Sequence, residues 1–156
     1  MAAEFDAVME TPFGALGVRT EENAIAEIRF LPPGTKTVEP KNALAARASQ
    51  QLAIWIADPS ARFDLPLKPA GTTFQRGVWR AIAAIPQGRT LTYGEIAKRL
   101  KSAPRAVGQA CGRNPYPIVV PCHRVVAADG GLGGFASATG GYLLDTKRWL
   151  LEHERG

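Results

Sequence analysis

The sequence lacks the features of membrane, secreted and disulfide-stapled proteins. No apolar run approaches the ~20 residues that a membrane-spanning helix needs. The N-terminus, MAAEFDAVME, carries acids where a secretory signal would carry bases and an apolar stretch. Cys111 and Cys122 are the only cysteines, and His123 and His153 the only histidines, so soft ligands for a structural zinc are few. We therefore expect a cytoplasmic protein with reduced thiols, no metal site and no membrane partner.

What the chain does contain is enough apolar sequence for a core and an excess of bases. Hydrophobic residues make up 46% and charged residues 21% of 156 residues, which excludes a disordered or fibrous chain. The formal net charge is +5, and the pI is near 9.6. From Arg76 to Arg124 bases recur while Glu95 is the only acid. This distribution favours a polyanionic partner that binds the middle of the chain.

The first third of the chain reads as a small α/β domain. Short, partly alternating segments separated by turn-like residues predict an antiparallel meander of three strands: 4–10, 15–20 and 24–30. Apolar residues at helical spacing predict a helix over 41–58, and 63–67 is a candidate for one more strand. The Pro- and Gly-rich segment 67–73 marks a boundary. We therefore divide the chain into domains 1–70 and 71–156.

The second domain is predicted to be mostly helical. A helix beginning at Thr72 or Thr73 carries one apolar face: Phe74, Val78, Ile82 and Ile85. Thr92 with Glu95 forms a capping-box pattern that opens the next helix, and Pro104 suits the first position of a third. Two helices joined by a short turn, in basic surroundings, indicate a helix-turn-helix motif. The sequence predicts a closing helix over 142–154, whose expected core contacts are Leu144, Trp149 and Leu151.

Chemistry points to the segment NPYPIVVPCHRV. The prolines and the apolar run before Cys122 predict a rigid, buried, extended segment. A free thiol has a pKa of ~8.5 and needs a neighbouring base or positive charge to become a nucleophilic thiolate. His123 and Arg124 follow Cys122 directly. The alternative is that Cys122 is a small buried hydrophobe, and a papain-like protease is a poor fit because its histidine lies far from its cysteine.

These residues carry a resemblance. The motifs FQRGVWRAIAAIPQGRTLTYGEIAKRL, PRAVGQACGRNP, PCHRV and KRWLLEHE resemble, in order, those of the O6-alkylguanine-DNA alkyltransferases, also called methylated-DNA–protein-cysteine methyltransferases. The match runs from Phe74 to Glu154, and the first third is only weakly similar. The resemblance implies a ribonuclease-H-like N-terminal domain. It also implies direct reversal of O6-alkylguanine damage in DNA by one irreversible transfer to cysteine, without a cofactor.

The resemblance also assigns roles to residues. Cys122 matches the nucleophile, His123 the base that takes the thiol proton through a water, and Glu154 the acid that orients that histidine. Asn114 matches the hinge between the recognition helix and the active-site segment, and Tyr93 the tyrosine that rotates the nucleotide and donates to the base.

The remaining matches concern DNA and the substrate pocket. Arg105 matches the arginine that fills the space left by the flipped base, since flipping costs a few kcal/mol and needs compensation. Small residues let the recognition helix lie in the minor groove of double-stranded DNA: Ala106 and Gly108. The pocket matches are Val125, Phe135 and Ala136.

Two departures and one rival function complete the prediction. Phe135 stands where a tyrosine is common, and the stretch before Lys147 is longer than the family pattern. The zinc site of some members would need N-terminal cysteines and histidines that this chain lacks. The rival is a non-enzymatic alkyltransferase-like protein that binds damage, in which the cysteine is replaced; Cys122 argues against it. We expect a monomer, associated with the nucleoid in a prokaryote.

Overall fold

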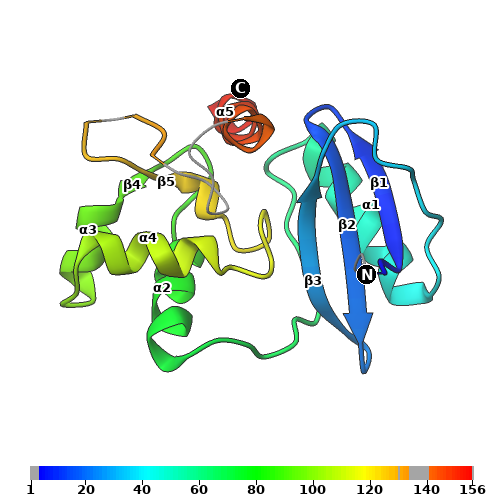
Figure 1. Cartoon of the computed structure of the whole chain (residues 1–156), viewed down its shortest axis with the longest axis horizontal. Helices are drawn as coiled ribbons and strands as arrows, with labels where there is room; N and C mark the ends of the chain where they lie inside the picture. The colour runs from blue at the N-terminus through cyan, green and yellow to red at the C-terminus, as the bar shows by residue number, and fades with distance from the viewer. Residues whose placement is uncertain (1–3, 130, 134–140, 156) are drawn as a thin grey trace. The chain divides into compact units, whose positions relative to one another are not determined.

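A computed structural model describes residues 4–129, 131–133 and 141–155. The chain divides into two compact units, Met1–Pro69 and Ala70–Gly156 (Figure 1). The first is a small sheet with one helix, and the second is mostly helical. This mixed α/β architecture confirms the predicted fold class.

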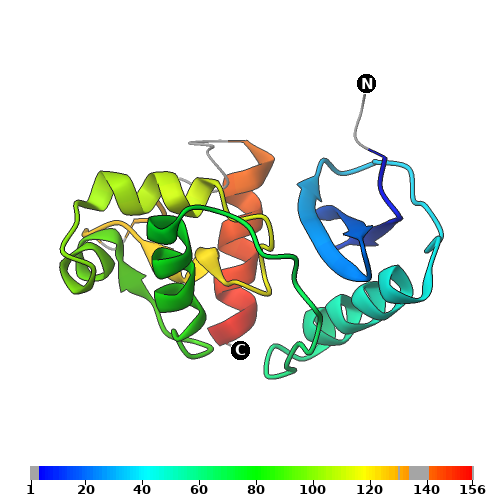
Figure 2. The same ribbon diagram turned by 90° about the horizontal axis from the view of Figure 1, so that it is seen from below.

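The N-terminal unit is the predicted meander. Strands β1 (Ala7–Thr11), β2 (Gly14–Glu21) and β3 (Ala24–Leu31) pair antiparallel in chain order. Helix α1 (Ala43–Ala57) lies across one face of this sheet (Figure 2). It begins at Asn42, whose side chain accepts the backbone N–H of Ala45 at 2.8 Å. An amide side chain is a favoured cap because it satisfies one of the unpaired N–H groups of the first turn.

Periodicity explains how this unit closes its core. The buried side chains of α1 recur at helical spacing: Ala45, Ala48, Leu52 and Trp55. The helix packs on the sheet, whose buried residues include Leu16, Val18, Ile25 and Ile28. The predicted strand at 63–67 is wrong. Those residues form one isolated bridge between Leu67 and Ile25, because prolines at 66 and 69 deny the segment ladder donors.

The C-terminal unit begins with three helices whose starts the sequence predicted. Helices α2 (Thr73–Ala83) and α3 (Tyr93–Arg99) both open with a complete capping box, and α4 (Pro104–Gly112) has proline in its first turn. Helices α3 and α4 pack against each other as the predicted helix-turn-helix (Figure 1). On α2, Val78 and Ile82 are buried. Phe74, which the sequence places on the same apolar face, is instead 38% exposed and lies outside the core.

The rest of the unit is short extended segments and a closing helix. Strand β4 (Leu91–Thr92) pairs in parallel with β5 (Val125–Val126), which follows the 3-10 turn η1 (Cys122–Arg124). Helix α5 (Tyr142–Arg155) packs against η1. Its buried residues include Leu150 and Leu151, whereas Leu144 and Trp149 are only half-buried, and Trp149 stacks on His153 at 4.7 Å between ring centroids.

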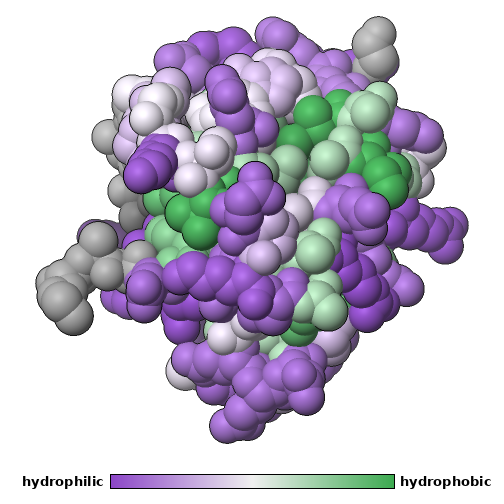
Figure 3. Space-filling model, turned by 90° about the vertical axis from the view of Figure 1, so that its right-hand side faces the viewer, coloured by the Kyte–Doolittle hydropathy of each residue, from purple (hydrophilic) through white to green (hydrophobic). Residues whose placement is uncertain are grey.

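The face of the molecule drawn in Figure 3 is largely polar. In the view of Figure 3, hydrophilic side chains predominate and hydrophobic ones lie between them in smaller groups. Within the residues that the structure describes, no helix combines the length and apolar character needed to cross a membrane.

Candidate active site

Cys122 lies at the start of η1 and is 5% exposed. Asn114, just beyond the end of α4, fixes its position. The Asn114 Nδ2 donates to Cys122 Sγ at 3.2 Å and to the Val120 carbonyl at 2.8 Å, while Asn114 Oδ1 accepts the Tyr116 N–H at 2.9 Å. This one amide therefore ties the end of α4 to the segment that carries the thiol.

The segment before Cys122 turns instead of running extended. The Val120 N–H donates to the Tyr116 carbonyl at 2.8 Å, and Ile118 has φ 75°. A β-branched residue in this region is a true outlier, which the surrounding contacts must hold in place. The prediction of an extended segment is wrong, while burial is confirmed, since Ile118 is 4% exposed.

The residues after Cys122 meet the last helix in a buried ion-pair network. His123 Nε2 lies 3.1 Å from Glu154 Oε1, and both residues are almost fully buried. Arg124 Nε donates to both Glu154 oxygens at 2.9 and 3.0 Å, and a second guanidinium nitrogen also pairs with this carboxylate. The Arg124 guanidinium donates in addition to the Ile85 carbonyl at 2.6 Å. The sequence did not predict this clamp, because Arg124 and Glu154 meet only in the fold.

This ion-pair network sets the protonation states of Glu154 and His123. Burial alone would raise the pKa of Glu154, but hydrogen bonds from His123 and Arg124 outweigh it and lower that pKa to about 2. Burial lowers the pKa of His123, against the opposite pull of Glu154. The imidazole is therefore neutral near pH 7 beside a carboxylate. If its Nε2–H donates to Glu154, its lone pair is on Nδ1, and the ring can accept a proton there.

The Cys122 side chain rests as a thiol. Contact with the thiol of Cys111 and burial raise the pKa of Cys122 well above its ordinary value. Because a thiol is a weak nucleophile, the site needs a base to form thiolate at the moment of reaction. A neutral histidine next in sequence is a suitable base, and the buried Glu154 carboxylate would stabilise the imidazolium that results.

A second group of side chains gathers around Tyr93. Lys147 is 0% exposed; its ammonium donates to the Val125 carbonyl at 2.8 Å and to the Leu132 carbonyl, and it lies 3.5 Å from the Tyr93 hydroxyl. Burial lowers the pKa of Lys147 to about 8 and raises that of Tyr93 to about 12. The phenol therefore keeps its proton near pH 7 and can donate it in a hydrogen bond.

Two glycines lie beside the Tyr93 ring, and only at Gly133 would an added Cβ collide with it. A Cβ on Gly108 of α4 would lie 4.0 Å from Tyr93 Cδ1, and a Cβ on Gly133 would lie 2.9 Å from Tyr93 Cε2. Gly133 also has φ 68°, a conformation that favours glycine. The ring is thus held between the recognition helix and the segment after β5.

The predicted DNA-contacting residues lie on α4. Arg105 is exposed in its first turn, and Ala106 and Gly108 are half-buried. The exposed bases of the helix-turn-helix add to this surface: Lys98, Arg99, Lys101 and Arg113.

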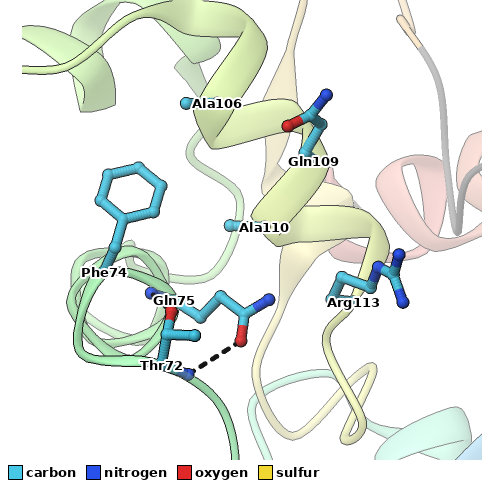
Figure 4. Close-up of a pocket in the computed structure, with 7 residues that line it drawn as sticks. All are labelled: Thr72, Phe74, Gln75, Ala106, Gln109, Ala110 and Arg113. Carbon is cyan, nitrogen blue, oxygen red and sulfur yellow. Dashed lines mark hydrogen bonds between the residues drawn. The ribbon is translucent and has the colours of Figure 1, made fainter.

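A hollow of about 580 Å³ separates the start of α2 from α4, and in Figure 4 the Gln75 side chain extends across it toward the second half of α4. Of the predicted pocket residues, Val125 is buried and its carbonyl accepts a hydrogen bond from Lys147, while Phe135 and Ala136 lie outside the described residues.

Comparison with known proteins decides the family. Residues 73–156 match the family model described as the DNA-binding domain of 6-O-methylguanine DNA methyltransferase. This chain belongs to the O6-methylguanine DNA methyltransferase family. The resemblance seen in its motifs is thereby confirmed.

Relatives of the family cover the whole chain. A methylated-DNA–protein-cysteine methyltransferase of Methanosarcina acetivorans is 41% identical over 95% of this chain and 96% of its own. The crystal structure of O6-methylguanine methyltransferase from Mycobacterium tuberculosis has a TM-score of 0.79 at 37% identity, covering 95% of this chain and 90% of that one. A structure of OGT from the same organism in complex with DNA has a TM-score of 0.80 at 37% identity, over 95% and 91%.

Proposed function

We propose that this methyltransferase repairs O6-alkylguanine in DNA by moving the alkyl group to Cys122 Sγ, once per protein molecule. The observation that carries the proposal is the buried His123–Glu154–Arg124 network beside a thiol held by Asn114. Residues 71–156 would bind DNA and transfer the alkyl group, and residues 1–70 would form a separate α/β domain.

The reaction is a displacement at carbon. His123 takes the thiol proton through a water, and the sulfur attacks the alkyl carbon as the bond from that carbon to O6 breaks. Guanine leaves as an anion, and the Tyr93 hydroxyl donates a hydrogen bond to its ring nitrogen. The pKa of about 12 for Tyr93 supports the last role, because an ionised phenol could not donate. No cofactor takes part, and the thioether has no easy reverse reaction.

Double-stranded DNA would bind through its minor groove along α4. Ala106 and Gly108 permit a close approach, and the exposed Arg105 would fill the space that the flipped base leaves. The scattered exposed bases, Arg113 among them, would contact phosphates, so affinity should fall with salt and vary little with sequence. We expect a monomer that acts in the cytoplasm.

The deciding experiment is intact-mass spectrometry after incubation with an oligonucleotide that contains O6-methylguanine. One added methyl group, mapped to Cys122, supports the proposal, and Cys122→Ser should bind the oligonucleotide without gaining mass. Binding of damage by the unaltered chain without any transfer would favour the alkyltransferase-like alternative. More than one repaired base per protein molecule would contradict the mechanism.

Base flipping has a separate test in Arg105→Ala. This change should slow transfer from duplex DNA more than from single strands, because in a single strand the target base need not be flipped out of a paired stack. Arg113→Ala is the matched control, because it removes an exposed base that directly follows the same helix. Equal slowing on both substrates would make Arg105 an ordinary phosphate contact.

A further inference from the structure

Cys111, which the mechanism does not use, lies beside the nucleophile. It belongs to the last turn of α4, and its side chain packs against the apolar cluster that contains Cys122. Asn114 links the two residues: its backbone N–H donates to the Cys111 carbonyl at 3.2 Å, and its Nδ2 donates to Cys122 Sγ at 3.2 Å. Both residues thus contact Asn114 and share one apolar cluster, and both thiols are unoxidised.

The two thiols differ in exposure and in charge preference. Cys111 is half-buried, whereas Cys122 is buried. The hydrogen bond from Cys122 lowers the pKa of Cys111, and the nearby Lys147 ammonium acts in the same direction. The more accessible thiol is therefore the one that ionises more readily. Accessible, low-pKa thiols react first with oxidants, and a second thiol beside them resolves the product.

We propose that Cys111 and Cys122 form a reversible intramolecular disulfide, which makes the pair a redox modification site of this protein. Its effect on repair rests on the proposed function of Cys122 as alkyl acceptor. The methylated cysteine is a permanent thioether, whereas the disulfide would hold the nucleophile in a form that a thiol reductant restores. The bond would also shield Cys122 from oxidation to sulfinic acid, which thiols do not reverse.

The reaction needs a small disulfide, such as oxidised glutathione, as the oxidant. The Cys111 thiolate attacks one of its sulfurs and expels the first glutathione thiolate. Cys122 then loses its proton to His123 and attacks Cys111 Sγ, which expels the second glutathione. Two protein thiols are oxidised to one disulfide, and one molecule of oxidised glutathione is reduced to two glutathione thiols. The two protons released by the protein thiols end on these glutathione thiols. A sulfur–sulfur bond of about 2.05 Å requires the contacting side chains to move closer.

Mass spectrometry tests the pair directly. The full chain is incubated with oxidised glutathione, blocked with N-ethylmaleimide and weighed intact. The expected product has lost two hydrogen atoms, carries neither blocker nor glutathione, and yields one peptide in which Cys111 and Cys122 are joined. Methyl transfer from an O6-methylguanine oligonucleotide should fall in proportion to the joined fraction and return after dithiothreitol.

Cys111→Ala is the matched variant. For each protein, the methyl transfer measured after oxidation is divided by the transfer of the same protein in its reduced form. Its oxidised-to-reduced ratio of transfer should stay close to one, because the remaining Cys122 is only 5% exposed. Two thiols still open to the blocker, a stable glutathione adduct on Cys111, or a link between two chains would overturn the proposal. Equal loss of transfer in both proteins would overturn it too. The reduced protein tests alkyl transfer alone, so failure of that function is seen separately from failure of the disulfide.

Discussion

Glu154→Gln tests whether the buried carboxylate holds the active site together. The change keeps the shape of the side chain but removes the charge that pairs with His123 at 3.1 Å and with Arg124 at 2.9 and 3.0 Å. Glu154 is 5% exposed, so solvent screens these contacts little. The variant leaves the Arg124 guanidinium without its carboxylate partner.

The magnitude follows from the pKa. Folding lowers the pKa of Glu154 from 4.5 to about 2, and since a factor of ten in proton affinity is worth about 1.4 kcal/mol, the carboxylate stabilises the fold by about 3 kcal/mol. Removing one member of a buried ion pair costs about 3 to 5 kcal/mol in other proteins, which agrees. For a unit of this size, the melting temperature should fall by about 10 to 20 °C.

The direction in which folding shifts each pKa fixes how stability depends on pH. Glu154 has a lowered pKa, so its stabilisation is present above pH 4.5 and is lost as the pH falls toward 2. The pKa of His123 is also lowered, so the folded protein resists its protonation and loses stability as the pH falls below 6.5. The difference between wild type and Glu154→Gln should therefore be full at pH 7 and shrink below pH 4.5.

Urea unfolding, followed by circular dichroism at several pH values, measures this difference in stability. Single-turnover methyl transfer measures how the change affects His123 as a general base. Transfer should slow by about a hundredfold, since His123 loses the group that stabilises its charged form. Glu152→Gln, an exposed carboxylate of the same helix, is the control and should change stability by less than about 0.5 kcal/mol. Equal stability of the two variants at pH 7 would refute the ion-pair argument.

Three further changes probe the rest of the site. Lys147→Met should lower stability by about 2 kcal/mol or more, because the ammonium donates to one buried and one part-buried carbonyl. In wild type, single-turnover transfer should fall as the pH rises through about 8, the pKa of Lys147, and the variant should lack this step. Asn114→Ala removes three hydrogen bonds and should slow transfer more than its loss of about 1 to 2 kcal/mol in urea unfolding explains. Gly133→Ala should slow transfer because its Cβ would lie 2.9 Å from the phenol ring. Gly141→Ala has a similar φ and, among the described residues, no neighbour within 4 Å, so it should not slow transfer.

Local signals predicted most of the helical framework. The capping box at Thr92 and Glu95 and the proline at position 104 place the starts of α3 and α4, since both act within one turn of chain. The errors occur where burial competes with local pattern. Phe74 has the spacing of a core residue but is 38% exposed, and Ile118 turns where an apolar run predicted an extended segment.

The sequence by itself identified the family and predicted Cys122 as the nucleophile, because its adjacency to His123 and the flanking motifs lie in one continuous stretch. Only the tertiary structure decided how the nucleophile is controlled. Glu154 meets His123 and Arg124 because α5 packs on η1. Cys111 comes near Cys122 because Asn114 ties the end of α4 to the active-site segment. Protonation states depend on burial and on charges that are distant in the chain, and packing alone brings these together.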